Sequence, residues 1–273
     1  MGGRGSSMKG SQGMGGGAVA PAAAAQAMPA IQIAPAAQAA PQQQSGPPTG
    51  ANGFGHLTPQ QVSAMENAAQ QQMMRDPKLA AGVTDYINPR MQSNGKGMSQ
   101  NANWAAATGQ PLTKQQKNML DAVNKLAKPI GAETTLYRAD HPDFLERHCG
   151  LPKNYSSMSD SQLRNLLVGK TWKSTSLEST AYDSRNNPFW PQPSGRGTGT
   201  HGQGGINSGN REILIRYHTA KTARAAFIQP SQSEAVLAVG TNHKITQVRT
   251  TRTGPTRTYL SGKKVLEVVI EVW

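Results

Sequence analysis

Two polar side chains, Gln232 and Glu234, precede an apolar segment in an arrangement that could support chemistry. They are two positions apart, and the run Ala235-Val-Leu-Ala-Val239 follows at once. Residues two apart on an extended backbone share a face, so both side chains would point into one cleft. A carboxylate fixed at the start of a buried strand can stabilise positive charge developing on a reacting carbon. Glu234 is therefore the candidate catalytic carboxylate, with Gln232 beside it.

The same stretch also fits the start of a helix. Ser231-x-x-Glu234 before an apolar run is the pattern of a capping box. However, the apolar run is too short for a helix and stops at Gly240. The alternating segment Lys244–Val248 that follows is typical of a strand. We therefore expect strands on both sides of Gly240.

Two further polar clusters come earlier in the chain. The first is Tyr137-Arg138, and the second is Ser174-Thr175-Ser176. Taken singly, each has a plain explanation. A strand arginine is most often on the surface or ion-paired, and Ser-Thr-Ser is common in edge strands and turns.

Taken together and in this order, the three clusters resemble the Arg, Ser-Thr-Ser and Glu signature of the mono-ADP-ribosyltransferases, in the toxin-like arginine–serine–glutamate branch. The surrounding segments are similar to the family's first, second and catalytic strands; they are Leu136–Ala139, Leu167–Leu177 and Ser233–Val248. The resemblance covers roughly residues 112–273. It implies an α+β, ADP-ribosyltransferase-like fold with two packed, mainly antiparallel sheets and an N-terminal helical lobe.

The resemblance also implies that NAD is the substrate. Glu234 would bind the ribose and stabilise the oxocarbenium-like carbon formed as nicotinamide leaves. Ser174 would hydrogen-bond this carboxylate and the ribose, and Arg138 would hold phosphate or ribose oxygens. The other residues expected to contact NAD are Tyr137, Thr175, Ser176, Arg185 and Phe189. The last two lie in a glycine-rich stretch, where ordinary loop residues are an equally good explanation.

Gln232 bears on the acceptor of the ADP-ribose group. Family members with Gln-x-Glu generally modify asparagine, glutamine or, in some, guanine bases, whereas Glu-x-Glu members modify arginine. A neutral amide cannot deprotonate a guanidinium but can hydrogen-bond an amide or a base edge. We therefore expect transfer to an Asn/Gln-type side chain of a host protein. The alternatives are a nucleic-acid acceptor and a non-enzymatic phage virion or scaffold component.

Composition limits the partners and the compartment. The 28 basic against 15 acidic residues give a net charge of +13, which favours anionic partners such as nucleic acid. The single cysteine, Cys149, excludes an internal disulfide framework, and no metal site is expected because no second ligand pair accompanies it. Neither a membrane span nor a signal peptide is expected. We expect a monomer that acts in the host cytoplasm. Its opening residues resemble those of some phage-encoded proteins, which would be consistent with packaging in a phage particle.

The helices and strands expected to carry these residues begin after residue 56. Residues 1–56 are rich in Gly, Ala, Pro and Gln and predict a disordered, low-complexity tail. An ADP-ribosyltransferase-like domain is expected over 57–273, with a helical part at 57–130 and a β-rich catalytic core at 131–273. Thr58 and Thr113 predict helix N-caps. Strands are expected at 134–139, 212–217, 224–228, 234–239, 243–248 and 265–273.

Overall fold

The computed structural model describes Pro48 and residues 54–88, 97–183, 212–252 and 264–273. Most of the predicted tail therefore lies outside the described residues. Among the described residues, four helices come first: α1 (Pro59–Arg75), α2 (Pro77–Ile87), α3 (Met98–Ala107) and α4 (Lys114–Leu126). Two more follow later, α5 (Pro142–Cys149) and α6 (Asp160–Leu167), together with the 3-10 turns η1 (Tyr155–Ser157) and η2 (Pro230–Gln232). None of the described helices is long and apolar enough to cross a membrane.

The first helices begin where the sequence predicts. Thr58 and Thr113 each accept a hydrogen bond from the backbone of a glutamine three residues on, and each glutamine side chain bonds back to the cap. Within the lobe, α2 approaches α4 closely at Gly82. A Cβ atom placed on Gly82 would lie 2.5 Å from that of Ala122, so only glycine permits this helix spacing.

The strands form one hydrogen-bonded ladder. They are β1 (Lys128–Pro129), β2 (Thr134–Asp140), β3 (Thr171–Lys173), β4 (Glu178–Ala181), β5 (Glu212–Thr219), β6 (Arg224–Gln229), β7 (Glu234–Leu237), β8 (Asn242–Arg252) and β9 (Lys264–Val272). Their order is β1-β6-β7-β4-β2-β5-β9-β8-β3. All neighbours are antiparallel except β5 and β9.

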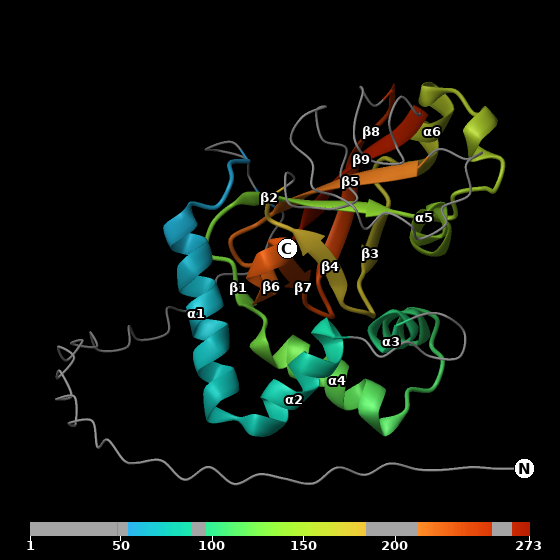
Figure 1. The fold of residues 1–273 in the computed structure, drawn as a ribbon. Helices are drawn as coiled ribbons and strands as arrows, with labels where there is room; N and C mark the ends of the chain where they lie inside the picture. Colours follow the sequence, from blue (N-terminus) through green and yellow to red (C-terminus); the bar gives the residue numbers. More distant parts are fainter. Residues whose placement is uncertain (1–47, 49–53, 89–96, 184–211, 253–263) are drawn as a thin grey trace, which may run out of the picture. The chain divides into compact units, whose positions relative to one another are not determined.

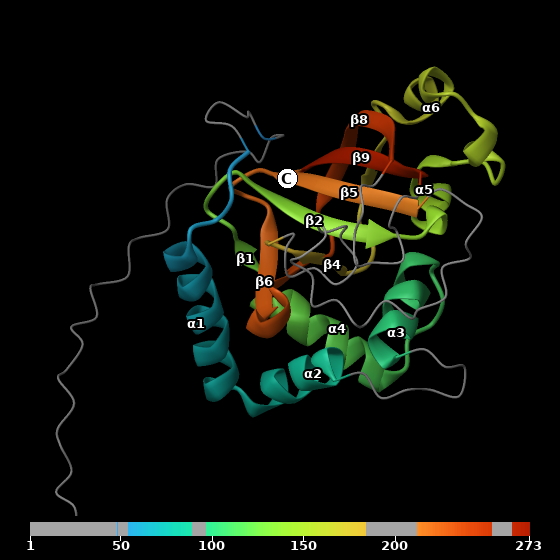
Figure 2. The ribbon, with the colours of Figure 1, turned by 45° about the horizontal axis from the view of Figure 1, so that its top comes forward.

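The two predicted sheets correspond to the two halves of this ladder. In Figures 1 and 2, β5, β9 and β8 form one half, and in Figure 2 β6 lies below them and runs at a steep angle to them. The core between the halves contains Leu136 and Ile215 from one half and Leu237 from the other, all fully buried. A second core joins the helical lobe to the outer side of β6 and β7 through Val236. Helices followed by a mainly antiparallel sheet confirm the predicted α+β class.

The packed part of the chain begins before residue 57. Gly55 forms a β-bridge with Thr134, and the Phe54 ring stacks on His218 with centroids 3.8 Å apart. His56 in turn stacks on Tyr137 at 6.0 Å. The predicted boundary at residue 56 is therefore late by at least three residues, since residues 54–56 pack on β2 and β5.

Candidate active site

Three neighbouring strands bring the predicted arginine and glutamate together. In the ladder, Tyr137 of β2 faces Ala181 of β4, and Ala181 faces Glu234 of β7. Arg138 follows Tyr137 directly on β2. The strand β4 therefore lies between the two predicted site residues, and its side chains decide how they are connected.

Glu234 is the first residue of β7, as predicted, and its neighbour across the ladder holds it. Its Oε1 accepts a hydrogen bond of 2.5 Å from the Ser179 hydroxyl of β4. Burial raises the pKa of the Glu234 carboxyl, and the Ser179 hydrogen bond acts in the opposite direction. The carboxylate is thus poorly hydrated but oriented, which suits electrostatic stabilisation of a cation.

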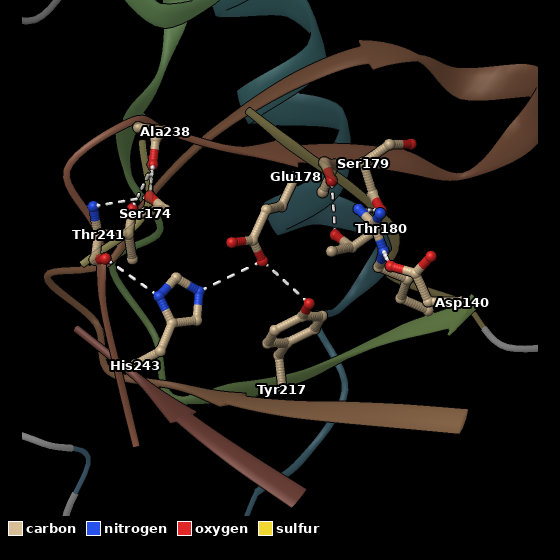
Figure 3. A network of polar contacts seen from close by, with 11 residues as sticks. Asp140, Ser174, Glu178, Ser179, Thr180, Tyr217, Ala238, Thr241 and His243 are labelled. Carbon is tan, nitrogen blue, oxygen red and sulfur yellow. Dashed lines mark hydrogen bonds and ion pairs between the residues drawn. The ribbon is translucent and has the colours of Figure 1, made fainter. Parts of the chain in front are cut away.

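Arg138 is fixed from two sides. Its Nε donates to Asp140 Oδ2 at 2.6 Å, and its Nη1 donates to the Ser179 carbonyl at 3.1 Å. Burial disfavours its charge, but nearby anionic groups, Asp140 foremost, outweigh this and raise the pKa of Arg138. Asp140 and Ser179 are both labelled in Figure 3. Ser179 therefore links the two charged residues, because its carbonyl accepts from Arg138 and its hydroxyl donates to Glu234.

Ser174 is not the hydroxyl that contacts Glu234. Its buried side chain donates to the Ala238 carbonyl and accepts from the Thr241 N–H, both at 3.2 Å (Figure 3). It thereby fastens the end of β3 to the turn between β7 and β8. The chain leaves β3 at Lys173 and enters β4 only at Glu178, so the Ser-Thr-Ser segment lies between two strands. Sequence reasoning missed Ser179, which follows the motif within a few residues.

The prediction that Gln232 and Glu234 share one face assumes an extended backbone, and this assumption is wrong. Gln232 ends the 3-10 turn η2, and Ser233 adopts a left-handed conformation with φ 53° and ψ 37°. The backbone here is not extended, so the alternation rule does not apply. A left-handed non-glycine residue is strained, and here it lies directly before the catalytic candidate.

The remaining predicted site residues have different outcomes. The Gln232 side chain, Arg185 and Phe189 lie outside the described residues. Tyr137 is buried beneath His56, whereas Thr175 is exposed and Ser176 half-buried. No group of three or more His, Cys, Asp or Glu within the described ranges could hold a metal ion.

The helical lobe supplies two residues that the sequence did not reveal. Asn103 of α3 accepts a hydrogen bond from the Leu177 N–H at 3.2 Å, just before β4. Tyr86 of α2 is buried and hydrogen-bonded to Asn103. Its pKa is raised, first by burial and then by the charge of Glu234. The lobe therefore reaches the site and fixes the approach to β4.

A buried polar network supports β4 from its other face. The Glu178 carboxylate accepts a hydrogen bond from the Tyr217 hydroxyl at 2.9 Å and lies 3.3 Å from His243 Nε2 (Figure 3). His243 Nδ1 lies 3.0 Å from the Thr241 carbonyl. Burial opposes ionisation of Glu178, but His243 and the Tyr217 hydrogen bond outweigh it and lower its pKa to about 2. Glu178 thus anchors the strand that presents Ser179.

Fold and site together define the class of protein. The profile of the ADP-ribosyltransferase exoenzyme family matches residues 52–267. The chain therefore belongs to this family. It is an enzyme that uses NAD as the donor substrate and transfers its ADP-ribose group. The predicted family and its fold are confirmed.

Solved structures show the same fold at low sequence identity. One is Plx2a, an ADP-ribosyltransferase toxin from Paenibacillus larvae, with a TM-score of 0.52 and 12% identity over 78% of this chain and 94% of that one. Another is the enzymatic component C2-I of the C2-toxin from Clostridium botulinum, with a TM-score of 0.51 and 14% identity over 81% of this chain and 49% of that one. No curated protein matches the chain.

Proposed function

We propose that the site formed by β2, β4 and β7 cleaves nicotinamide from NAD and transfers ADP-ribose to an Asn/Gln-type side chain of a host protein. The observation that carries this proposal is the linkage of Arg138 to Glu234 through Ser179. It joins a group suited to phosphate with a group suited to a cationic sugar carbon. The first can hold a dinucleotide, and the second can assist cleavage of its glycosidic bond.

Glu234 is the residue that acts on the reacting carbon. As the bond between ribose C1′ and nicotinamide breaks, its electron pair leaves with the neutral nicotinamide and C1′ becomes oxocarbenium-like. The adjacent carboxylate stabilises this charge, and loss of such an interaction typically costs about 3–4 kcal/mol of barrier. The acceptor nitrogen then bonds to C1′ and gives up one proton, for which Glu234 is the base.

Arg138 is the residue that holds the dinucleotide. The contacts with Asp140 and the Ser179 carbonyl use Nε and Nη1 of the guanidinium, and its side chain remains partly exposed. The other N–H donors can face phosphate oxygens, for which a guanidinium is geometrically suited. The aromatic ring of Phe144 lies 5.5 Å below it and limits its movement.

The choice of an amide acceptor rests on Gln232. It lies on the turn that leads into Glu234, so an acceptor reaching C1′ would approach past it. Its amide can pair with another amide through one donor and one acceptor. The host cytoplasm as the place of action and a monomeric enzyme remain predictions.

The proposal is tested by incubating the protein and host lysate with NAD labelled in its adenylate part. We expect the label to be on protein, so that protease digestion releases it and nuclease digestion does not. Mass spectrometry should find ADP-ribose on asparagine or glutamine. Glu234→Gln should abolish labelling. Asp121→Asn, which removes an exposed carboxylate on α4, should not. Label found on nucleic acid or on arginine would refute the amide assignment.

A further inference from the structure

A second pocket lies outside the site described above. Its volume is about 610 Å³, and its walls come from α6, β5, β8 and β9. In both ribbon views α6 lies beside β8 (Figures 1 and 2). None of Arg138, Ser179 and Glu234 lines it. The pocket is large enough for a small organic ligand, since such sites typically measure about 300–1,000 Å³.

The ladder gives the separation between the two sites. Arg216, which lines the pocket, faces Tyr137 across the β5–β2 pair, and Tyr137 connects through Ala181 to Glu234. Arg216 and Glu234 are therefore three strand spacings apart. At about 4.8 Å per spacing, the path along the sheet is about 14 Å. A ligand in the pocket would lie against α6, β5, β8 and β9, and not against β4 and β7, which carry Ser179 and Glu234.

Three arginines and one buried carboxylate line this pocket. They are Arg164 of α6, Arg216 of β5 and Arg249 of β8. Glu267 of β9 is almost fully buried, with its Oε1 2.7 Å from Arg216 Nε and its Oε2 2.7 Å from Arg249 Nη2. Because the buried carboxylate orients two guanidiniums, it holds their positive charge at the pocket, where a ligand can meet it.

The charges around the pocket favour an anion. Three arginines against one glutamate leave an excess of two positive charges. This excess matches a phosphate monoester, which carries close to two negative charges at neutral pH. A single carboxylate would balance only half of it. A guanidinium group can also donate two parallel hydrogen bonds to two oxygens of one phosphate.

The rest of the lining suits the organic part of a nucleotide. Asn165 and Gln247 offer amide donors and acceptors, and Val168 and Val269 offer apolar surface. His218 borders the pocket with its ring stacked on Phe54. Cationic, amide and apolar groups in one concavity are the combination that a phosphate attached to a base and sugar requires.

We propose that this pocket, built by α6, β5, β8 and β9, binds a phosphate-bearing ligand of nucleotide size. The ligand is either a free nucleotide or a phosphate group of a nucleic acid. Both sources present phosphate oxygens beside a heterocyclic base, as a dianionic monoester in a free nucleotide and as a monoanionic diester in a nucleic-acid backbone. The proposal concerns binding alone and does not depend on which acceptor the enzyme modifies.

The test compares binding of AMP, by calorimetry, with binding of a short end-labelled single-stranded oligonucleotide, by fluorescence anisotropy. The variants are Arg164→Gln and Arg249→Gln, with Lys117→Gln on α4 as a charge-matched control. In the Arg249 variant, Arg216 still pairs with Glu267, so the fold is retained. We expect both pocket variants to bind about tenfold more weakly or worse, and the control to bind as the parent.

The two sources give different outcomes. If AMP binds as tightly as the oligonucleotide, the ligand of the pocket is a free nucleotide. Tighter oligonucleotide binding that falls steeply with salt identifies nucleic acid. The proposal is overturned if neither probe binds, or if the pocket variants bind as well as Lys117→Gln. It is also overturned if Arg138→Gln, with an unchanged melting temperature, removes binding, because the phosphate would then occupy the NAD site.

Discussion

The hydroxyl of Ser179 lies 2.5 Å from Oε1 of Glu234, across the paired strands β4 and β7. The carbonyl of the same serine accepts from Arg138. One residue between the two predicted site strands therefore orders both charged groups. This relationship makes Ser179, and not Ser174, the hydroxyl whose loss should change the chemistry.

Ser179→Ala should reduce kcat for NAD cleavage by about tenfold, because a hydrogen bond to a charged group is lost. The hydrogen bond lowers the pKa of Glu234, so its removal raises that pKa further. Since the carboxylate must be ionised, the acid limb of the pH–rate profile should move to higher pH. Nicotinamide release measured across pH checks both effects.

Ser174→Ala is the matched comparison for this experiment. It removes a buried hydroxyl that holds the turn after β7, so it should cost about 1–2 kcal/mol of stability. Its pH–rate profile should keep the parent's acid limb. A shifted limb in Ser174→Ala and an unshifted one in Ser179→Ala would contradict our assignment of the two hydroxyls.

Gln232→Ala should separate the two half-reactions. The residue lies on the turn before Glu234, where an acceptor would approach, but the NAD-cleaving carboxylate is unchanged. Slow NAD hydrolysis, with water as acceptor, should persist, whereas labelling of the host target should fall strongly. Nicotinamide release and target labelling are measured on one preparation. Equal losses in the two assays would show that Gln232 only shapes the turn.

Glu178→Gln should destabilise the protein by about 3 kcal/mol at neutral pH, because it breaks a buried pair with His243. The folded-state pKa of Glu178 is lowered from 4.5 to about 2. Its contribution to stability is therefore present above pH 4.5 and is lost as pH falls toward 2. Urea unfolding at several pH values should show parent and variant converging in acid. A constant difference down to the lowest pH would argue against an ionised Glu178.

Two N-terminal deletions should differ in stability. Removal of residues 1–47 should leave the melting temperature unchanged, because that composition offers little apolar surface to bury. Removal of residues 1–56 also deletes the Phe54 ring stacked on His218, and should cost about 1 kcal/mol, or a few degrees. Equal melting temperatures in the two truncated proteins would show that the stack contributes nothing.

Local signals predicted much of this fold and part of the site. The sequence predicts Thr58 and Thr113 as caps because a cap depends only on the next few residues. It predicts Arg138 and Glu234 on strands because their flanking segments are short and β-rich. These are properties of contiguous sequence, and the structure confirms them.

The residues that were missed depend on pairing between distant segments. Ser179 meets Glu234 only because β4 and β7 adopt one register, which nothing near Ser179 encodes. Tyr86 and Asn103 reach the site through packing of the helical lobe. The sequence does not indicate the left-handed backbone at Ser233, because glycine is the residue usually found in that conformation.

The position of β9 has a consequence for how the enzyme is made. β9 is the last described strand along the chain, yet it lies between β5 and β8 and is the link that joins them. Until the ribosome has released residues 264–272, β5 and β8 each keep an open edge, and open edges invite pairing with other chains. A product cut short after β8 should therefore aggregate, and chains still in synthesis lack the strand that joins the two parts of the sheet.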